Sequence, residues 1–340
     1  MKILVLRILR ALGLFALCRR FYADKTLILA YHGFELMDET AFRDQLFIKA
    51  QTLKTRLDYL QQHCNVQPLQ ALDDNQQVKN KVIITIDDGW TSTLTVAAPI
   101  FKQYQMPYTV YLTTENVLDN QPIFHIALDY ILGHNLGKQL KYQHEDGQVL
   151  QMTISRGSIG QIMAAVKPFK RELNDTRLLL DIAKALDFDF DPVLDCKALT
   201  LMSVEQVQAI KAAGADIQLH THSHNTPLGE FDEFASEIEV NRKHIEDIIG
   251  ETAVHHCYPS GVYNADSIAY LKRLNVTTAT TCYPGLVTDS SDRLELPRFL
   301  DSENIPQIVF EAEVSGVLEV FRKLRTLVAG GNDSGACQLQ

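Results

Sequence analysis

The chain has 340 residues, of which 46% are hydrophobic, and 32 basic against 42 acidic side chains give a formal charge of −10. This length allows a sizeable core in one large domain or two ordinary ones. The acidic balance lacks the basic footprint of a nucleic-acid-binding protein, so we expect no nucleic-acid partner. Six scattered cysteines without CxxC spacing predict reduced thiols rather than disulfides.

Residues 1–24 form a basic and apolar segment. Five Lys and Arg side chains interrupt the apolar residues up to Phe21, and the longest uncharged run, Ala11–Cys18, is too short to span a bilayer. We expect an interfacial helix that makes the protein membrane-associated, peripheral on the cytoplasmic face. An uncleaved signal-anchor with an external catalytic domain and an ordinary packed helix are the alternatives. At the other end, residues 329–340 are expected to form a flexible tail.

Between residues 25 and 328, strand patterns alternate with amphipathic helix patterns. The expected strands are 27–31, 82–86, 108–112, 216–219, 253–257, 277–281 and 294–296. The expected helices are 40–63, 93–104, 203–213, 231–249 and 264–274. Ser203 and Gln206 form a capping box at the third helix, and Gly250 stops the fourth. The alternation predicts an α/β fold with parallel strands, right-handed crossovers and closure into a barrel or partial barrel.

The alternation stops between the third and fourth strands. Residues 117–200 hold amphipathic segments and a hairpin-like stretch, Lys141–Gln151, around Asp146 and Gly147. Because this insertion is too long for a plain loop, we expect a subdomain beside the mouth of the barrel.

Two polar clusters follow predicted strands. Asp87 and Asp88 follow a β-branched run. Two adjacent carboxylates repel each other and are costly to desolvate, so a bound metal ion or different roles for the two acids are expected to offset that cost. A polar turn closed by Gly89 is the alternative. His220 and His224 belong to a cluster of three histidines in five residues, where an i, i+4 pair can face one ion. The alternative for this cluster is a solvent-exposed turn.

The candidate residues share one position relative to the strands. Six of them follow directly on predicted strands: His32, Asp87, Asp88, His220, Tyr258 and Arg298. The carboxyl ends of parallel barrel strands gather on one face, which is where active sites form. One carboxylate and two imidazoles would leave zinc an open coordination position, which is the catalytic pattern.

These motifs resemble the polysaccharide deacetylases with a NodB-type homology domain, a group similar to carbohydrate esterase family four. TIDDGW is similar to the family's Thr-Phe-Asp-Asp-Gly, and HTHSH to its His-Ser/Thr-x-x-His. The resemblance covers roughly residues 26–301, with the insertion outside it. It implies a distorted seven-stranded (β/α) barrel, with Asp88, His220 and His224 as metal ligands and Asp87 as general base.

Two later motifs depart from the family. Its Arg-Pro-Pro-Tyr is replaced by Cys257 and the three residues after it, so the arginine that would brace the base is missing. Arg298 is the expected substitute. No histidine follows His256, so His32 is expected to replace the family's late acid. An early Tyr-His is similar to the branch that deacetylates biofilm poly-N-acetylglucosamine. A strand-end histidine bonded to a carbonyl is the alternative for His32.

The resemblance implies a metal-dependent hydrolase that removes N-acetyl groups from an amino sugar in a polysaccharide or lipid-linked glycan. The expected cofactor is a divalent metal, Zn ahead of Co or Ni. Tyr258, Ser260 and Trp90 are expected to bind substrate, with core packing as the alternative for Trp90. Other functions remain open: a deformylase or amide hydrolase of a small lipid-linked sugar, and a catalytically inactive carbohydrate-binding relative. No role is assigned to five histidines: His125, His134, His144, His255 and His256.

Overall fold

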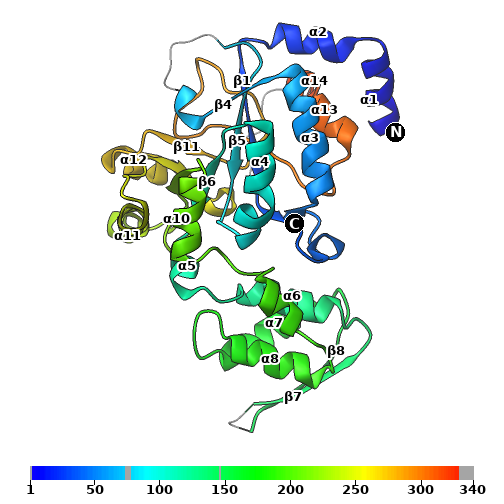
Figure 1. Cartoon of the computed structure of the whole chain (residues 1–340), viewed down its shortest axis with the longest axis vertical. Coiled ribbons are helices and arrows are strands. Elements are labelled where there is room, and N and C mark those ends of the chain that lie inside the picture. Colours follow the sequence, from blue (N-terminus) through cyan, green and yellow to red (C-terminus); the bar gives the residue numbers. More distant parts are fainter. Residues whose placement is uncertain (1, 73–77, 145–146, 329–340) are drawn as a thin grey trace.

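A curved parallel sheet lies at the centre of the computed structural model (Figure 1). The structure describes residues 2–72, 78–144 and 147–328, so the predicted tail at 329–340 lies outside the described residues. Within that part of the chain the strand order is β11-β10-β9-β6-β5-β1-β12, and β4 pairs with β5 away from this path. The strands are β1 (Thr26–Tyr31), β4 (Asn65–Gln67), β5 (Lys81–Ile86), β6 (Thr109–Leu112), β9 (Asp216–Leu219), β10 (His255–Cys257), β11 (Thr278–Thr280) and β12 (Phe299–Leu300).

The seven strands of the path curl into a half-barrel, which confirms the predicted α/β fold with parallel strands. The last strand was expected at 294–296, and this is wrong. Leu296 makes only an isolated parallel bridge with Thr280, whereas Phe299 pairs with Leu29 of β1. The intervening Pro297 has no N–H to continue a ladder. Residues 296–300 thus contact β11 at Leu296 and join β1 from Phe299 onward. This segment connects β11 at one edge of the sheet with β1 near the other edge.

Helices cover the outer face of the sheet. They are α3 (Ala50–His63), α4 (Ala98–Tyr104) after the π-helical turn η3 (Thr93–Ala97), α10 (Val204–Ala212), α11 (Phe231–Ile249) and α12 (Ala265–Arg273). The Ser203/Gln206 capping box is present, as predicted.

The first predicted helix, 40–63, is correct only in its second half. The turn η1 (Glu39–Ala41) and the strand β3 (Phe47–Ile48) precede α3, and β3 pairs with β2 (Gly33–Phe34). The Phe47 ring lies so close to Gly33 that a Cβ there would be 2.3 Å from it. This tertiary contact overrides the helical spacing of the apolar residues.

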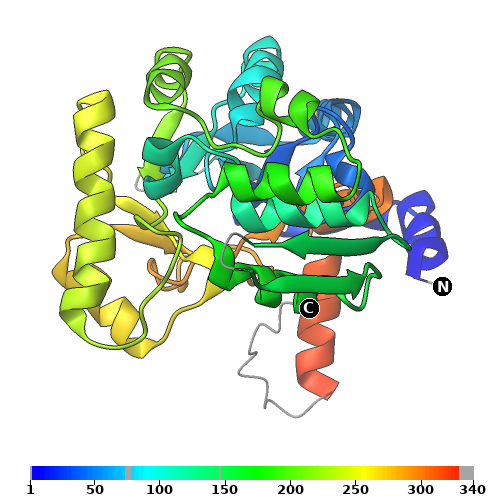
Figure 2. The ribbon, with the colours of Figure 1, turned by 90° about the horizontal axis from the view of Figure 1, so that it is seen from below.

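The predicted insertion is a layer of helices and one hairpin at the far end of the molecule from the N-terminal helices (Figures 1 and 2). The described part of the hairpin, β7 (Gln139–Gln143) and β8 (Val149–Thr153), is antiparallel as expected. Asp146, one of the two residues around which the hairpin was expected, lies outside the described residues. The helices are α5 (Glu115–Asp119), α6 (Phe124–Gly133), α7 (Ile159–Val166), α8 (Thr176–Ala185) and α9 (Asp191–Cys196), with the short turn η4 (Lys167–Phe169).

Both ends of the described chain meet in one helical cluster. The N-terminal segment forms two helices, α1 (Lys2–Ala11) and α2 (Leu14–Phe21), separated at Gly13, whose φ of 78° is in the left-handed region. They pack on α13 (Gln307–Val314) and α14 (Val317–Val328). Among the described residues, none of the helices is both long enough and apolar enough to cross a bilayer.

Candidate active site

The polar residues singled out in the sequence converge where the strands end. Asp87 follows β5, His220 follows β9, and His32 follows β1. Arg298 reaches the same place from the other direction, since it precedes β12 rather than following a strand. The parallel sheet therefore brings together residues that are far apart in the chain.

Asp88 and two histidines form a cluster that fits a divalent cation. The Asp88 Oδ1 atom lies 3.3 Å from Nε2 of His220 and 3.2 Å from Nε2 of His224. It is buried, and it has no hydrogen-bond partner within the part of the chain that is described. A buried carboxylate oxygen without a partner is costly, and a cation between the three donor atoms would offset that cost. The donors match a three-ligand zinc site with an open position.

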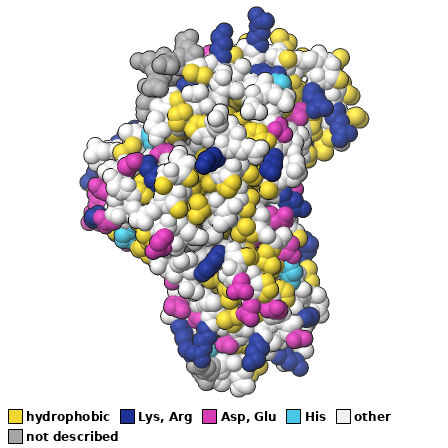
Figure 3. All heavy atoms as spheres, viewed as in Figure 1, with side chains coloured by type: hydrophobic (Ala, Val, Ile, Leu, Met, Phe, Trp, Pro, Cys, Tyr) yellow, Lys and Arg dark blue, Asp and Glu magenta, His cyan; other side chains and the backbone are white. Residues whose placement is uncertain are grey.

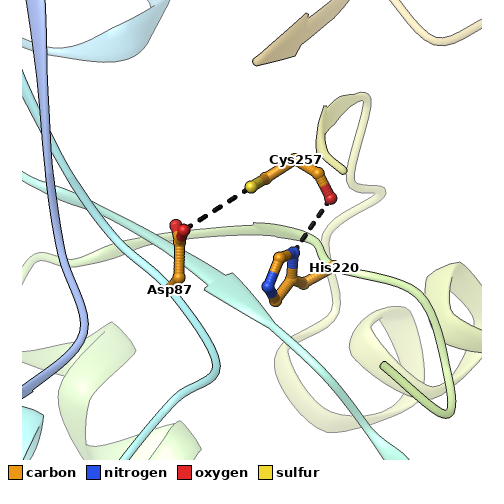
Figure 4. Close-up of side chains that lie close together, drawn as sticks. All are labelled: Asp87, His220 and Cys257. Carbon is orange, nitrogen blue, oxygen red and sulfur yellow. Dashed lines mark hydrogen bonds between the residues drawn. The ribbon is translucent and has the colours of Figure 1, made fainter. Parts of the chain in front are cut away.

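Neighbouring groups orient these three ligands. The His220 Nδ1 atom lies 2.9 Å from the backbone carbonyl of Cys257 (Figure 4), so Nδ1 carries the proton and Nε2 is left free to bind a metal. The indole N–H of Trp90 donates to Oδ2 of Asp88 at 2.9 Å. Burial raises the pKa of Asp88, but the two adjacent imidazoles bring it well below its usual range. The carboxylate form, which a metal requires, is therefore the one present.

A second cluster of possible metal ligands is not suited to binding a cation. Asp87, His220 and Cys257 also lie near one another (Figure 4). Both oxygens of Asp87 are occupied by Arg298, at 2.7 and 2.8 Å, and Arg298 Nη2 lies 2.9 Å from the Cys257 sulfur. A permanently charged guanidinium at this point repels a cation. The Asp88 group is therefore the candidate metal site.

Arg298 is a fully buried brace for Asp87. Besides its paired bonds to the carboxylate, it donates to the carbonyl of Thr281 at 3.0 Å and to the hydroxyl of Thr85 at 3.1 Å. Burial alone would raise the pKa of Asp87, but the ion pair with Arg298 outweighs it and lowers this pKa below its usual value. Asp87 is consequently held both ionised and fixed in orientation.

His32 and His224 are the members of the site that reach solvent. His32 Nε2 lies 3.7 Å from Oδ2 of Asp87, and 20% of its side chain is exposed, against 37% for His224. The opening of the site therefore lies over these two rings. Within the described residues the His32 ring makes no hydrogen bond to a backbone carbonyl, and it lies both beside the Asp87 carboxylate and at the surface.

The three expected substrate residues differ in placement. Ser260 is exposed on the turn after β10, with a φ of 54°. The Tyr258 side chain lies instead in the core, where its hydroxyl donates to the carbonyl of Leu294 at 3.0 Å. Trp90 is only 3% exposed and packs edge-on against Phe47, so core packing is its role here and it cannot stack on a sugar. Its indole N–H serves Asp88 instead.

Asn241 is a site residue that the sequence analysis missed. Its side chain accepts from the backbone N–H of His220 at 3.0 Å and donates to the carbonyl of Leu112 at 2.9 Å. It therefore ties the end of β9 to the end of β6 and fixes the start of the histidine turn. The available signal was a polar residue within the buried stripe of α11, between Ile238 and Ile245.

His125 of the insertion lies close enough to the site for the charges of His224 and Asp88 to affect it. Trp90 pairs with Leu201, and Pro122 pairs with the adjacent Thr200, each in an isolated antiparallel bridge. The residues after Asp88 and the residues before α6 therefore both lie against residues 200–201. The side chain of His125 is exposed, yet desolvation by neighbouring atoms and the charges of Arg43 and His224 lower its pKa, while the charge of Asp88 raises it. The motifs gave no sign of this residue, because the insertion is separate from them in the sequence.

The sequence comparison agrees with this geometry. A family model described as polysaccharide deacetylase matches residues 74–164 and 170–279, which is more than half of the chain. The chain belongs to the polysaccharide deacetylase family. This confirms the resemblance inferred from the Asp-Asp and histidine motifs, and membership makes the protein a carbohydrate deacetylase. The match also includes most of residues 117–200, so the expectation that the insertion lies outside the resemblance is wrong. No curated protein matches the chain significantly in sequence.

Solved structures of deacetylases share the fold. The Streptococcus pyogenes deacetylase PplD in complex with acetate has a TM-score of 0.55 and 17% identity, covering 87% of this chain and 98% of that one. IcaB from Ammonifex degensii has a TM-score of 0.51 and 16% identity, covering 86% and 97%. A de-N-acetylase from Aggregatibacter actinomycetemcomitans has a TM-score of 0.53 and 14% identity, covering 85% and 100%. At these identities the likeness establishes the fold.

Proposed function

We propose that this polysaccharide deacetylase is a metal-dependent hydrolase that removes N-acetyl groups from an amino sugar in a polysaccharide or lipid-linked glycan. The observation that carries the proposal is the buried Oδ1 of Asp88, which makes no hydrogen bond in the described chain and lies within 3.3 Å of two imidazole nitrogens and next to an arginine-braced carboxylate. An acid–base pair beside a cation site is suited to amide hydrolysis by an activated water.

Asp88, His220 and His224 would hold the metal, with Zn expected ahead of Co or Ni because three protein ligands and an open position are the pattern of catalytic zinc sites. When bound, the cation acts as a Lewis acid toward the acetyl carbonyl and the attacking water. Asp87 accepts a proton from that water, because Arg298 keeps its carboxyl ionised. The exposed turn at Ser260 can present backbone N–H groups to the oxyanion.

His32 supplies the proton that the departing amine needs. An imidazole exchanges protons near neutral pH, whereas Arg298 remains protonated and cannot serve as an acid. His32 has the exposure to meet a substrate and faces the base that received the water's proton. In sum, a C–O bond forms and the amide C–N bond breaks, giving acetate and a free amino sugar. The Streptococcus pyogenes neighbour was solved in complex with acetate, which is the acid product expected here.

The test combines metal analysis with turnover. Chelation should abolish acetate release, and Zn²⁺ or Co²⁺ should restore it. Asp88→Ala and His220→Ala should lose bound metal, whereas Asp87→Asn should keep the metal and lose turnover. If Asp87→Asn retains full kcat, Asp87 is not the base. A parallel series of N-formyl and N-acetyl sugars decides between the acetyl substrate and a formyl one.

A further inference from the structure

The exposed apolar side chains of the protein are concentrated on three helices. Of the large hydrophobic residues that are exposed in the described chain, more than half belong to α1, α2, the link between them, and α14. Leu12 is 70% exposed, Phe21 is 73% and Leu327 is 79%. The full set is Ile3, Leu4, Val5, Ile8, Leu12, Leu17, Phe21, Phe321, Leu324 and Leu327. We call these residues the terminal apolar surface.

This surface is separate from the face by which the helices pack on the domain. Leu6 and Phe15 are 4% exposed and lie in a small core with Ile308, Ala312 and Val317. The expected alternative of an ordinary packed helix therefore accounts for one face of α1 and α2 only. Because those contacts already hold the helices in place, the opposite face is presented to the solvent in a fixed position.

Positive charge borders the terminal apolar surface. The first 23 residues carry five basic and no acidic side chains, in a chain whose net charge is −10. Two of the basic groups already have partners in the protein, since Arg10, although 54% exposed, pairs with Glu311 at 2.7 Å and Arg19 donates to the hydroxyl of Tyr59. Lys2, Arg7 and Arg20 remain directed at the surface. Figure 3 shows Lys and Arg side chains among hydrophobic ones along the upper edge, over α1 and α2.

We propose that the terminal apolar surface docks on an anionic lipid bilayer, with Lys2, Arg7 and Arg20 beside the lipid headgroups. Apolar side chains that enter the headgroup boundary, together with basic groups attracted by anionic lipid, are the two components of interfacial membrane binding. The structure adds α14, which contacts α2 and supplies Phe321, Leu324 and Leu327. The docking element is therefore built from both ends of the described chain rather than from the N-terminal segment alone.

The topology places the active site away from this surface. Helix α2 ends just before β1 begins, at the amino end of the parallel strands, whereas Asp88 and His220 lie at the carboxyl end. A six-residue strand such as β1 spans about 20 Å. On the basis of the proposed function, the enzyme would therefore act on sugars of a polymer that stand off the bilayer, not on a sugar attached directly to a lipid in that bilayer.

Vesicle binding tests the docking surface with the full-length chain. Truncation at Asp24 would uncover the apolar partners of Leu6 and Phe15 on α13, so point variants are preferable. The triple variant Leu17→Glu, Phe21→Glu, Leu327→Glu should bind phosphatidylglycerol-containing vesicles at least about tenfold more weakly than the unmodified chain. The pair Leu173→Glu, Leu180→Glu, at exposed leucines of the insertion, is the matched control and should bind normally.

Salt and lipid composition test the electrostatic part. Binding should weaken with rising salt and on vesicles of phosphatidylcholine alone, because screening and loss of anionic lipid both remove the attraction. If the full chain does not sediment with anionic vesicles at low salt, or if the triple variant binds as well as the insertion control, the proposal is wrong. Neither result depends on deacetylase activity, so a failed proposal on function would leave this test intact.

Trp90 gives a test of the orientation. It is the only tryptophan of the chain and contacts Asp88, so its fluorescence reports the position of the active site. Brominated acyl chains should leave the Trp90 emission of bound protein unquenched, whereas a Leu17→Trp variant should gain a quenched component. Quenching of Trp90 in the unmodified protein would show that the site faces the bilayer.

Discussion

Replacing Arg298 with methionine tests whether this arginine braces the catalytic base. The substitution keeps the volume of the side chain but leaves the Asp87 carboxylate in the core without its paired bonds at 2.7 and 2.8 Å. Removing one partner of a fully buried ion pair costs about 3–5 kcal/mol, since the remaining charge is uncompensated. We expect Arg298→Met to lose that much free energy of unfolding, measured by urea denaturation near pH 7.

The same change should shift the pH dependence of catalysis. The pKa of Asp87 in the folded protein lies below the ordinary carboxyl value. The ion pair therefore contributes its full stability when the pH is above that ordinary pKa, and this contribution is lost as the pH falls through the pKa of the folded state. Without Arg298, burial dominates and the pKa of Asp87 rises. The acid limb of kcat/KM should then move to higher pH, and kcat should fall on the order of 10²-fold.

Arg56 offers a matched control for this experiment. It forms a second buried ion pair, with Asp301 at 3.0 Å, outside the active site. Arg56→Met should lose comparable stability yet keep the wild-type pH profile. If Arg298→Met and Arg56→Met have the same pH profile, Arg298 stabilises the fold and has no role in the base. Cys257→Arg combined with Arg298→Ala, which vacates the space of the original side chain, should restore part of the kcat lost by Arg298→Ala alone, because the Cys257 sulfur lies 3.6 Å from Asp87.

Three further predictions concern the remaining groups of the site. His32→Ala should lower kcat on the order of 10²- to 10⁴-fold with metal content intact. The loss should be smaller for an acetylated phenol, whose leaving group needs no proton. An equal loss on both substrates would exclude His32 as the acid. His125→Ala should raise KM severalfold with little change in kcat or metal content, because this exposed ring lies near His224 of the site. An unchanged KM would remove it from the substrate path. Exchanging residues 117–197 for another insertion should alter substrate preference more than metal affinity, as judged from a panel of acetylated oligosaccharides, and an unaltered preference would count against a role in selecting substrates.

The sheet could be predicted because its signals are local. The central strands such as β1 and β5 are short, largely apolar runs followed by polar residues, and helices end at recognisable caps such as Gly250. Parallel topology then brings the strand ends together without any knowledge of side-chain contacts. This is why Asp87 and His220 could be expected to be neighbours, although 133 residues separate them in the chain (220 − 87 = 133).

The errors occurred where tertiary contacts decide between two local patterns. Phe42 and Leu46 have helical spacing, but Phe47 and Ile48 form a strand against Gly33 and Phe34. Trp90 presents a similar problem on the scale of a single side chain. A tryptophan after an Asp-Asp turn can face a sugar or pack inward, and only its contacts with Phe47 and Asp88 show that it packs inward. Periodicity and composition do not contain that information.

The arginine brace shows that a functional group can be kept while its position in the sequence changes. What Asp87 requires is a guanidinium with two donors directed at its carboxylate, and the backbone position that supplies it is not specified by the chemistry. The end of β10 and the segment before β12 both border this carboxylate, since Cys257 and Arg298 each contact it. A large side chain at both positions would clash, so the small cysteine at the end of β10 provides the space that Arg298 occupies. The departure from the family motif at Cys257 and the presence of Arg298 are therefore two parts of one arrangement, and a substitution at either position should be judged together with the other.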